Sequence, residues 1–593
     1  MTTDQIIFFL ILGCVFLLFV WGRWRYDFIA FGALLASVFA GLVSSEIAFS
    51  GFSHPAVITV ASVLIISRGI AVSGAIDRIA HIVVPPVKSL ALQIGCMSGF
   101  AALLSAIMNN VAALALLMPA TIESAKNAKR SPALLLMPLS FGSILGGLIT
   151  LIGTPPNIVI GSYRQDALGE PFSMFDFAPV GGVIALVGVI YLALIGWRLL
   201  PKERQSNAVT DELFDIDNYT SEVVVKGDSA VIGMKLSEFS RLAKEQDVIV
   251  VDFVRNHQPL GLRKSATLIK EKDCLIVVAT PKDLDGFTNK NSLELKGQDE
   301  EGKGIFSVSD AMMMEAVISS DSRLIGRESG DIRLKSRYGL NLLGVSRQGK
   351  TIRKRLHKVI FQAGDILLLQ GDDCMPDALA KFKLLPLESR DIQIGKRSHA
   401  WLAIGLLAFA LILTATGTFG LTICLAIAAF GMVATSIVPL RDVYDSIDWP
   451  VLVLVGAMIP IGGALETTGS TTLITDFILS VSEGYSPVIV LLLLFIITMT
   501  LSDIMNNVAT AVMMAPIGVA LATALDVNPD TFLMAVAVSS SCAFLTPIGH
   551  KNNALVMGPG GYEFGDYWRV GLPLEVIITC VAIPMILLVW PLT

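Results

Sequence analysis

Two short polar motifs interrupt long apolar stretches and contain the residues best suited to chemistry. Ser105 stands shortly before Asn109-Asn110, and Ser502 stands at the same spacing before Asn506-Asn507. The stretches around them, 105–119 and 502–516, align without a gap. Hydroxyl and amide oxygens can bind a hard cation, and amide hydrogens can bind an anion. We therefore predict that each motif forms part of an ion-binding site.

A break rich in Gly and Pro follows each motif. The first comprises Gly146-Gly147 and Gly153-Thr-Pro-Pro-Asn157, and the second comprises Thr546-Pro-Ile-Gly549 followed by Asn552-Asn553. Such breaks release backbone carbonyls that suit a cation and amides that suit an anion. The alternative is that polar residues here only link neighbouring helices. Because the pattern occurs twice, we favour a site and align Thr154 with Thr546.

Two acidic residues, Glu466 and Asp503, lie within apolar stretches. Ionisable groups in such positions are candidates for coupling a cation to transport. Their repeat counterparts are Ala71 and Ala106, so a coupling role would be asymmetric. The alternative, that Asp503 caps a half-helix and Glu466 lies near an aqueous end, remains open.

The composition indicates which elements position these motifs. The chain has 593 residues, of which 53% are hydrophobic and 16% charged, with a net charge of -6. This composition excludes an ordinary soluble enzyme and gives no basic field for binding nucleic acid. The seven cysteines are scattered, so neither a disulfide framework nor a zinc site is expected. Runs that reach or approach the length of a membrane span are Gln5–Trp21, Phe28–Leu42, Ala56–Ala71, Val180–Trp197, Ala400–Thr416, Leu421–Val438 and Gly571–Pro591.

The expected fold is an α-helical polytopic membrane protein with two membrane repeats, residues 1–205 and 396–593. Each repeat is expected to have about five spans plus one re-entrant hairpin that contains the Met-Asn-Asn motif. An odd number of spans would invert the second repeat relative to the first, as in many secondary transporters. Lys and Arg beside the spans favour external N- and C-termini and a cytoplasmic central insert; Arg164 is the exception.

The charged insert is also duplicated, into domains 206–298 and 299–395. Segments 221–225, 231–233, 248–255 and 272–278 recur as 314–318, 324–326, 340–347 and 364–370. Short β-branched runs alternate with the helical patterns Leu236–Lys244 and Met375–Phe382. We expect two small α/β domains in series.

The double hairpin, the repeated break and the inserted domains resemble the divalent anion:sodium symporter family, in its sulfate-permease-like branch. The insert resembles paired C-terminal domains of potassium-channel regulators, of the TrkA-C or RCK-C type. The resemblance implies an inner-membrane homodimer that binds Na⁺ and a small anion, and cytoplasmic domains that bind a nucleotide or cyclic dinucleotide. Two arginines of the insert, Arg255 and Arg347, are candidate contacts for that regulatory ligand.

The resemblance also implies roles for individual residues. The sodium ligands would be Ser105, Asn109, Asn110, Gly153, Ser502, Asn506, Asn507 and Thr546. The substrate ligands would be Asn110, Asn507, Thr154, Asn157, Thr546 and Asn553. In both hairpins the family's Ser-Asn-Thr signature is changed, with Asn replacing Ser and Val replacing Thr, at Asn109 and Val111 and at Asn506 and Val508. The loss of these hydroxyls favours a compact oxyanion such as sulfate over a dicarboxylate.

The expected function is therefore sodium-coupled transport of a small divalent anion by alternating access, without enzymatic activity. The alternatives are a dicarboxylate symporter, an arsenite or sodium/proton type carrier, and an ion channel gated by the inserted domains.

Overall fold

The fold is described from a computed structural model of the whole chain. It describes residues 1–593 except 22–23, 74–88, 129, 206–219, 247, 256–257, 260–266, 279–286, 289, 296–311, 320–321, 333, 335–337, 339, 348–349, 353–357, 372–378, 380, 388–399, 417, 471 and 474–485. The chain divides into a helical unit, Met1–Ser206 with Ser389–Thr593, and an inserted unit, Asn207–Glu388. The boundaries predicted at 206, 299 and 396 lie outside the described residues.

The first half of the helical unit contains three helices, then a helical hairpin, then a broken pair. The first three are α1 (Thr3–Trp21), α2 (Tyr26–Phe39) and α3 (Pro55–Val72). The hairpin consists of α5 (Leu90–Ser105) and α6 (Asn110–Asn127), so the Met-Asn-Asn motif forms its tip, as the sequence predicts. Helices α7 (Ala133–Gly146) and α8 (Pro155–Leu168) flank the break, and α9 (Ala178–Leu194) and the short α10 (Lys202–Gln205) follow.

The second half has a similar order of elements, with the additional short helix α19 before its hairpin. Its first helices are α17 (Ala400–Ala415), α18 (Leu421–Ala434), α19 (Leu440–Ser446) and α20 (Trp449–Thr467). The second hairpin is α22 (Pro487–Ile504) with α23 (Asn507–Ala524). The second broken pair is α24 (Pro529–Ser541) and α25 (Lys551–Met557), and α26 (Tyr567–Val589) ends the unit.

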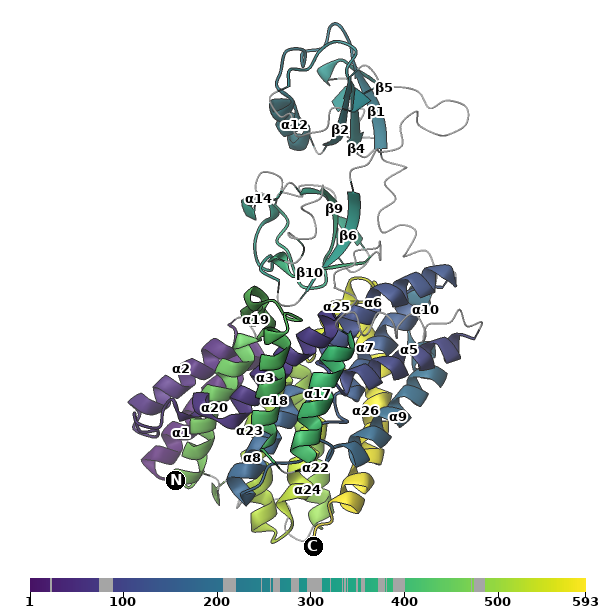
Figure 1. Ribbon diagram of the computed structural model, residues 1–593. Helices are drawn as coiled ribbons and strands as arrows, with labels where there is room; N and C mark the ends of the chain where they lie inside the picture. Colours follow the sequence, from purple (N-terminus) through teal and green to yellow (C-terminus); the bar gives the residue numbers. More distant parts are fainter. Residues whose placement is uncertain are drawn as a thin grey trace. The chain divides into compact units, whose positions relative to one another are not determined.

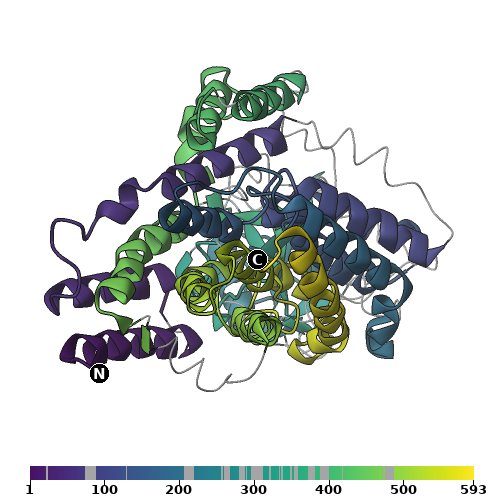
Figure 2. The ribbon, with the colours of Figure 1, turned by 90° about the horizontal axis from the view of Figure 1, so that it is seen from below.

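Helices from the two halves of the sequence pack side by side in the helical unit (Figure 1, Figure 2). One group contains α1, α2, α3, α17, α18 and α20, in which α20 contacts α2 and α18 contacts α3. The other group contains both hairpins, both broken pairs, α9 and α26, in which α26 contacts α9. The larger contacts between the groups join α3 to α6 and α8, and α20 to α23.

The lengths of the helices fit a membrane protein with several spans. Among the described residues, four helical segments are long and apolar enough to cross a bilayer: Pro55–Val72, Pro487–Ile504, Asn507–Ala524 and Phe564–Val589. Helices α19 and α20 together form a fifth candidate that is bent by 55°. Eight further apolar helices have 10–17 residues. Since about 20 residues span the hydrocarbon core, these shorter helices must tilt little or cover only part of its depth.

The inserted unit contains two antiparallel sheets with the same topology. The strands of the first sheet are β1 (Thr220–Val225), β2 (Ile249–Arg255), β3 (Gln258–Pro259), β4 (Cys274–Val278) and β5 (Leu293–Leu295), in the order β3-β2-β4-β1-β5. Those of the second are β6 (Met312–Ile318), β7 (Asn341–Arg347), β8 (Lys350–Ile352), β9 (Ile366–Gly371) and β10 (Leu384–Pro386), in the order β10-β6-β9-β7-β8. The second order read backwards matches the first strand for strand, so both segments build the same sheet.

The helical patterns predicted for the insert have different outcomes. Leu236–Lys244 forms helix α12 (Leu236–Glu245), which lies on the first sheet with Phe239 and Ala243 in its core. A short helix, α14 (Ser329–Ile332), begins at the corresponding place in the second domain. Most of Met375–Phe382 lies outside the described residues.

Arg255 and Arg347 make the same ion pair in the two sheets. Each guanidinium binds a buried aspartate through two hydrogen bonds, Arg255 to Asp273 at 2.7 Å and Arg347 to Asp365 at 2.8 Å. Each also donates to a backbone carbonyl of its own domain, that of Leu268 or Ile360. Side-chain exposure is only 2% for Asp273 and 1% for Asp365, so these arginines neutralise buried charge. The structure shows Arg255 and Arg347 in ion pairs within each domain, and their contact with a regulatory ligand stays a prediction.

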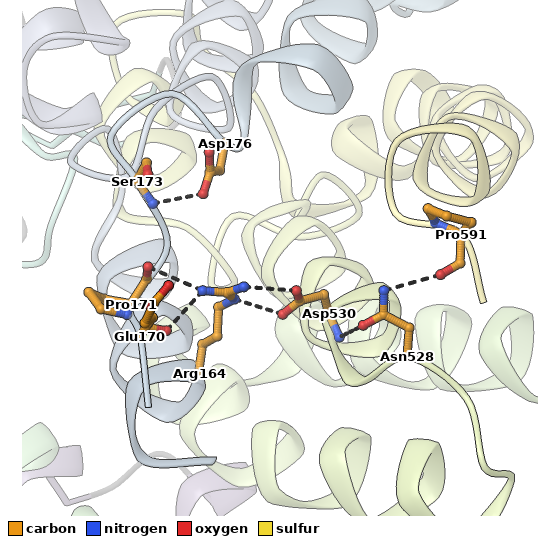
Figure 3. Close-up of polar contacts among 8 residues, drawn as sticks. All are labelled: Arg164, Glu170, Pro171, Ser173, Asp176, Asn528, Asp530 and Pro591. Carbon is orange, nitrogen blue, oxygen red and sulfur yellow. Dashed lines mark hydrogen bonds and ion pairs between the residues drawn. The ribbon is translucent and has the colours of Figure 1, made fainter. Parts of the chain in front are cut away.

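Arg164, the exception to the charge rule, is also paired. It lies on α8, and its guanidinium binds the carboxylate of Asp530 at 2.7 and 3.0 Å at the start of α24 (Figure 3). It also donates to the carbonyls of Glu170 and Pro171, and its guanidinium carbon lies 4.8 Å from the centre of the Phe172 ring. Because Asp530 neutralises its charge, Arg164 carries little of the free positive charge on which the positive-inside rule depends.

We expect replacement of either Arg164 or Asp530 by leucine to lower the free energy of unfolding by roughly 3 kcal/mol, because the remaining charge is left largely buried without its partner. The double variant Arg164→Leu/Asp530→Leu should cost less than the sum of the single changes, since neither charge is left behind. Thermal unfolding of the detergent-purified protein measures the effect. Strictly additive losses would show that the ion pair contributes nothing.

We expect Arg347→Met to destabilise the second sheet by about 2–3 kcal/mol, because Asp365 loses its charged hydrogen-bond donor. Limited proteolysis of the full-length chain should then cut within 312–386 faster than in the unmodified protein. The matched control is Arg327→Met, since Arg327 is exposed in the same domain. Equal cleavage rates in the two variants would contradict a stabilising role for the Arg347–Asp365 pair.

Candidate functional site

The tips of both hairpins have the same local hydrogen bonds. The side-chain oxygen of Asn109 accepts from the Val111 amide, and that of Asn506 accepts from the Val508 amide, both at 2.9 Å. These are N-cap bonds, which satisfy amides that the helix itself leaves free. The first Asn of each motif thus begins a helix, and its side-chain oxygen already has a partner.

The second Asn of each motif is paired with the upstream serine. Ser105 Oγ lies 2.7 Å from the side-chain amide of Asn110, and Ser502 Oγ lies 3.2 Å from that of Asn507. All four side chains are buried. Ser502 also hydrogen-bonds the carbonyl of Ser540 in α24. Each tip therefore brings a hydroxyl and an amide together away from solvent, and the cation site at these residues stays a prediction.

Each hairpin is tied to the break of its own half by a threonine. Thr150 Oγ1 donates to the carbonyl of Ala106 at 2.6 Å, and Thr546 Oγ1 donates to the carbonyl of Asp503 at 2.6 Å. Thr150 is thus the counterpart of Thr546, and the alignment of Thr154 with Thr546 is wrong by four residues. The similar Thr-Pro pairs at 154–155 and 546–547 caused the error, because they lie at different points of the two breaks.

An asparagine braces each break from the helix that follows it. The amide group of Asn157 donates to the carbonyls of Gly147 and Thr150, and that of Asn553 donates to those of Ala543 and Thr546, at 2.9–3.2 Å. These carbonyls lie ten and seven residues before the asparagine in both halves. Both hydrogens of each amide are therefore used. The oxygen of Asn553 also accepts from Ser140 Oγ at 2.8 Å, so of these two side-chain oxygens only that of Asn157 has no partner among the described residues.

The glycines of the first break allow close approach to the hairpin. A Cβ on Gly147 would lie 2.5 Å from the side-chain oxygen of Asn110, and one on Gly153 would lie 2.6 Å from the carbonyl of Gly147. A larger residue at Gly147 would push the break away from the tip, and one at Gly153 would clash with Gly147 within the break. Gly153 therefore lets the backbone of the break fold back against Gly147, and its role as a sodium ligand stays a prediction.

The start of α25 lies on the tip of the first hairpin, an arrangement that the sequence does not reveal. His550 Nε2 lies 3.3 Å from the side-chain nitrogen of Asn110, and Asn552 donates to the backbone carbonyl of Asn110 at 3.2 Å and to Ser143 Oγ at 2.6 Å. Thr154 precedes α8 as His550 precedes α25, so these two residues are the true counterparts. The sequence feature that marks His550 as a candidate site residue is its position directly after the second break.

A second acidic side chain joins Asp503. Asp503 Oδ1 accepts from the Leu545 amide at 2.9 Å, and Glu575 Oε1 accepts from the adjacent Phe544 amide at 3.2 Å. Both carboxyl groups are buried, and each accepts a hydrogen bond from one of two adjacent backbone amides. Glu575 was missed although it interrupts the apolar run Gly571–Pro591. The side chain of Glu466, the other predicted acid, lies outside the described part of α20.

Comparison with known proteins gives the family. The family model described as "Citrate transporter" matches residues 16–531 and 484–593. An uncharacterized transporter of Synechocystis is 32% identical over 563 residues, covering 93% of this chain and 91% of the relative. The Escherichia coli transporter YfbS is 29% identical over 98% of each chain. Sodium/sulfate cotransporter 1 of Chlamydomonas reinhardtii is 26% identical over 308 residues, which cover 50% of this chain and 35% of that protein.

The expected resemblance to divalent anion:sodium symporters is thus supported through a relative that is named a sodium/sulfate cotransporter, while the matching family model is that of citrate transporters. The Synechocystis and Escherichia coli relatives are transporters by name, in agreement with the expectation that the protein is not an enzyme. With a family model that matches most of its length, the chain belongs to the citrate transporter family.

Proposed function

We propose that this protein couples Na⁺ to the transport of a small divalent anion, with sulfate as the preferred substrate. The observation that carries the proposal is the repeated unit of a Ser–Asn pair at a hairpin tip beside an Asn-braced break. Hydroxyl, amide and backbone oxygens at these tips suit a small hard cation. The sodium/sulfate cotransporter among the relatives supports this choice of ions.

In this proposal the two tips supply the binding groups. Na⁺ is bound by oxygens of Ser105, Asn110 and Gly153 in the first half. In the second half it is bound by oxygens of Ser502, Asn507 and Thr546. The backbone at Asn109 and Asn506 completes the sets, because their side-chain oxygens cap the following helices. The anion is bound between the tips, with Thr154, Asn157 and Asn553 nearby.

The substrate choice rests on the residue that follows each Asn pair. Val111 and Val508 present methyl groups where a hydroxyl would otherwise be available to a carboxylate. A compact tetrahedral oxyanion requires fewer contacts than citrate or a dicarboxylate, so it suffers least from the loss of two hydroxyls. The family name keeps citrate and dicarboxylates as the alternative substrates.

The architecture completes the proposal. The two halves of the helical unit are inverted repeats in an inner membrane and alternate between two access states. The inserted domains are cytoplasmic regulators of the TrkA-C type that bind a nucleotide or cyclic dinucleotide, the termini are external, and the protein is a homodimer.

A second candidate is a carrier that exchanges or co-transports protons. The buried acids Asp503 and Glu575 favour it, because two carboxyl groups held on adjacent backbone amides in an apolar unit are a natural proton-binding group. Uptake driven by a pH gradient in the absence of Na⁺ would favour this candidate over the first.

In proteoliposomes, we expect an inward Na⁺ gradient to drive uptake of labelled sulfate, and Asn110→Ala with Asn507→Ala to abolish it. Ser105→Ala alone should raise the Na⁺ concentration for half-maximal uptake about tenfold, which corresponds to roughly 1.4 kcal/mol of lost binding energy. The control is Ser98→Ala on the same helix, since the Ser98 hydroxyl has no hydrogen-bond partner among the described residues. Unchanged uptake in the double variant would refute the assignment of the site.

We expect a cyclic dinucleotide applied to the cytoplasmic face of the membrane to change the rate of sulfate uptake, whereas the same compound on the external face should not. The measurement uses the full-length protein in vesicles of known orientation. Equal rates with and without the compound on both faces would contradict a regulatory role for the insert toward this ligand class.

A further inference from the structure

The contact between His550 and Asn110 joins the second break to the first hairpin. His550 Nε2 lies 3.3 Å from the Asn110 side chain, and Ser105 Oγ lies 2.7 Å from the same amide group. His550 is 8% exposed and Asn110 is 4% exposed, so water does not readily supply partners for either side chain. The polar groups of Ser105, Asn110 and His550 must therefore satisfy one another, so the donor and the acceptor in each contact can be worked out from these three side chains.

The other ring nitrogen of His550 fixes the tautomer. Nδ1 accepts a hydrogen bond from the backbone amide of Asn552 at 3.1 Å and so caps α25. A nitrogen that accepts carries no hydrogen, and a neutral imidazole carries one hydrogen in total. That hydrogen is consequently on Nε2, and Nε2 is a donor toward Asn110.

The orientation of the Asn110 amide follows from this tautomer. The oxygen and nitrogen of an amide have the same shape, so their positions are assigned from their partners. Because His550 Nε2 is a donor, the atom of Asn110 that faces it must be the side-chain oxygen. The side-chain nitrogen of Asn110 then faces Ser105 and donates to Ser105 Oγ. The amide oxygen that the first cation site needs is thus held by the imidazole N–H.

The second hairpin lacks this contact. The counterpart of His550 is Thr154, and among the described residues Thr154 makes no hydrogen bond to Asn507. Asn507 keeps its bond to Ser502 and is not held by an imidazole. The two tips therefore differ in how readily their amide oxygens become available to a cation.

We propose that His550 couples the anion to the cation at the first hairpin: with no anion bound, its Nε2–H occupies the side-chain oxygen of Asn110, and a bound anion takes this hydrogen bond and frees that oxygen for Na⁺. The inference rests on the proposed function, because it presumes that an anion and Na⁺ bind near Asn110. It assigns His550 a role in positioning the ligands of the site and in contacting the substrate.

The test separates the donor on Nε2 from the cap on Nδ1. In His550→Asn the side-chain oxygen can still cap α25, since Asn is a preferred N-cap residue, but no N–H reaches Asn110. In His550→Ala both interactions are lost. Thermal stabilisation of the purified full-length protein is measured against Na⁺ concentration, with and without sulfate, because a ligand that binds the folded state raises apparent stability.

In the unmodified protein, sulfate should lower the Na⁺ concentration for half-maximal stabilisation by about threefold to tenfold, the range expected for one released hydrogen bond. In His550→Asn this shift should be lost, and Na⁺ should bind without sulfate as tightly as it binds the unmodified protein with sulfate. The sulfate concentration for half-maximal uptake should rise, since the anion loses a donor.

Two results would overturn the inference, and they differ from each other. If His550→Asn keeps the full sulfate-dependent shift and only His550→Ala loses it, His550 merely caps α25. If the unmodified protein responds to neither Na⁺ nor sulfate, the proposed function itself fails, and the role of His550 fails with it.

Discussion

The structure depends on satisfying the backbone of two broken helices inside an apolar unit. A helix that stops there leaves carbonyls without partners, and an unpaired carbonyl in such surroundings is costly. Asn157 and Asn553 solve this problem in the same way, since each donates both amide hydrogens to carbonyls of the preceding break. Thr150 and Thr546 then fasten each break to the tip of a hairpin. The position of the candidate site follows from these bonds.

The differences between the halves are as informative as the shared pattern. Asn553 Oδ1 accepts from Ser140 at 2.8 Å, whereas Asn157 Oδ1 is buried without a partner among the described residues. Ala106 corresponds to Asp503, and Thr154 corresponds to His550. The first half thus provides mainly neutral oxygens, while the second half adds the acids and the imidazole. The same arrangement of hairpin and break can in this way hold two sites whose side chains differ in charge and in hydrogen-bonding groups.

The sequence predicted the hairpin tips well because the signal was local. A Met-Asn-Asn motif inside an apolar run can end one helix and begin another, and the N-cap bonds of Asn109 and Asn506 do this. The alignment of the breaks failed because it followed Thr-Pro pairs, while the matching bonds depend on distance from Asn157 and Asn553. The ion pairs of Arg255 and Arg347 could not be predicted because their partners, Asp273 and Asp365, stand immediately before the neighbouring strands β4 and β9. No local pattern shows which acid an arginine meets across a sheet.

The contacts of His550 and Glu575 escaped prediction for a related reason. Both act across the junction between elements distant in sequence, and a pattern within one segment shows only that a polar residue interrupts an apolar run. Coupling between two ligands requires such a junction, because a group that belongs to one site alone cannot respond to the other. His550 caps a helix of the second half through one ring nitrogen and reaches a hairpin of the first half through the other. One imidazole can therefore exchange its hydrogen-bond partner without unfolding either element, which is the smallest change by which an anion can alter the affinity of a cation site.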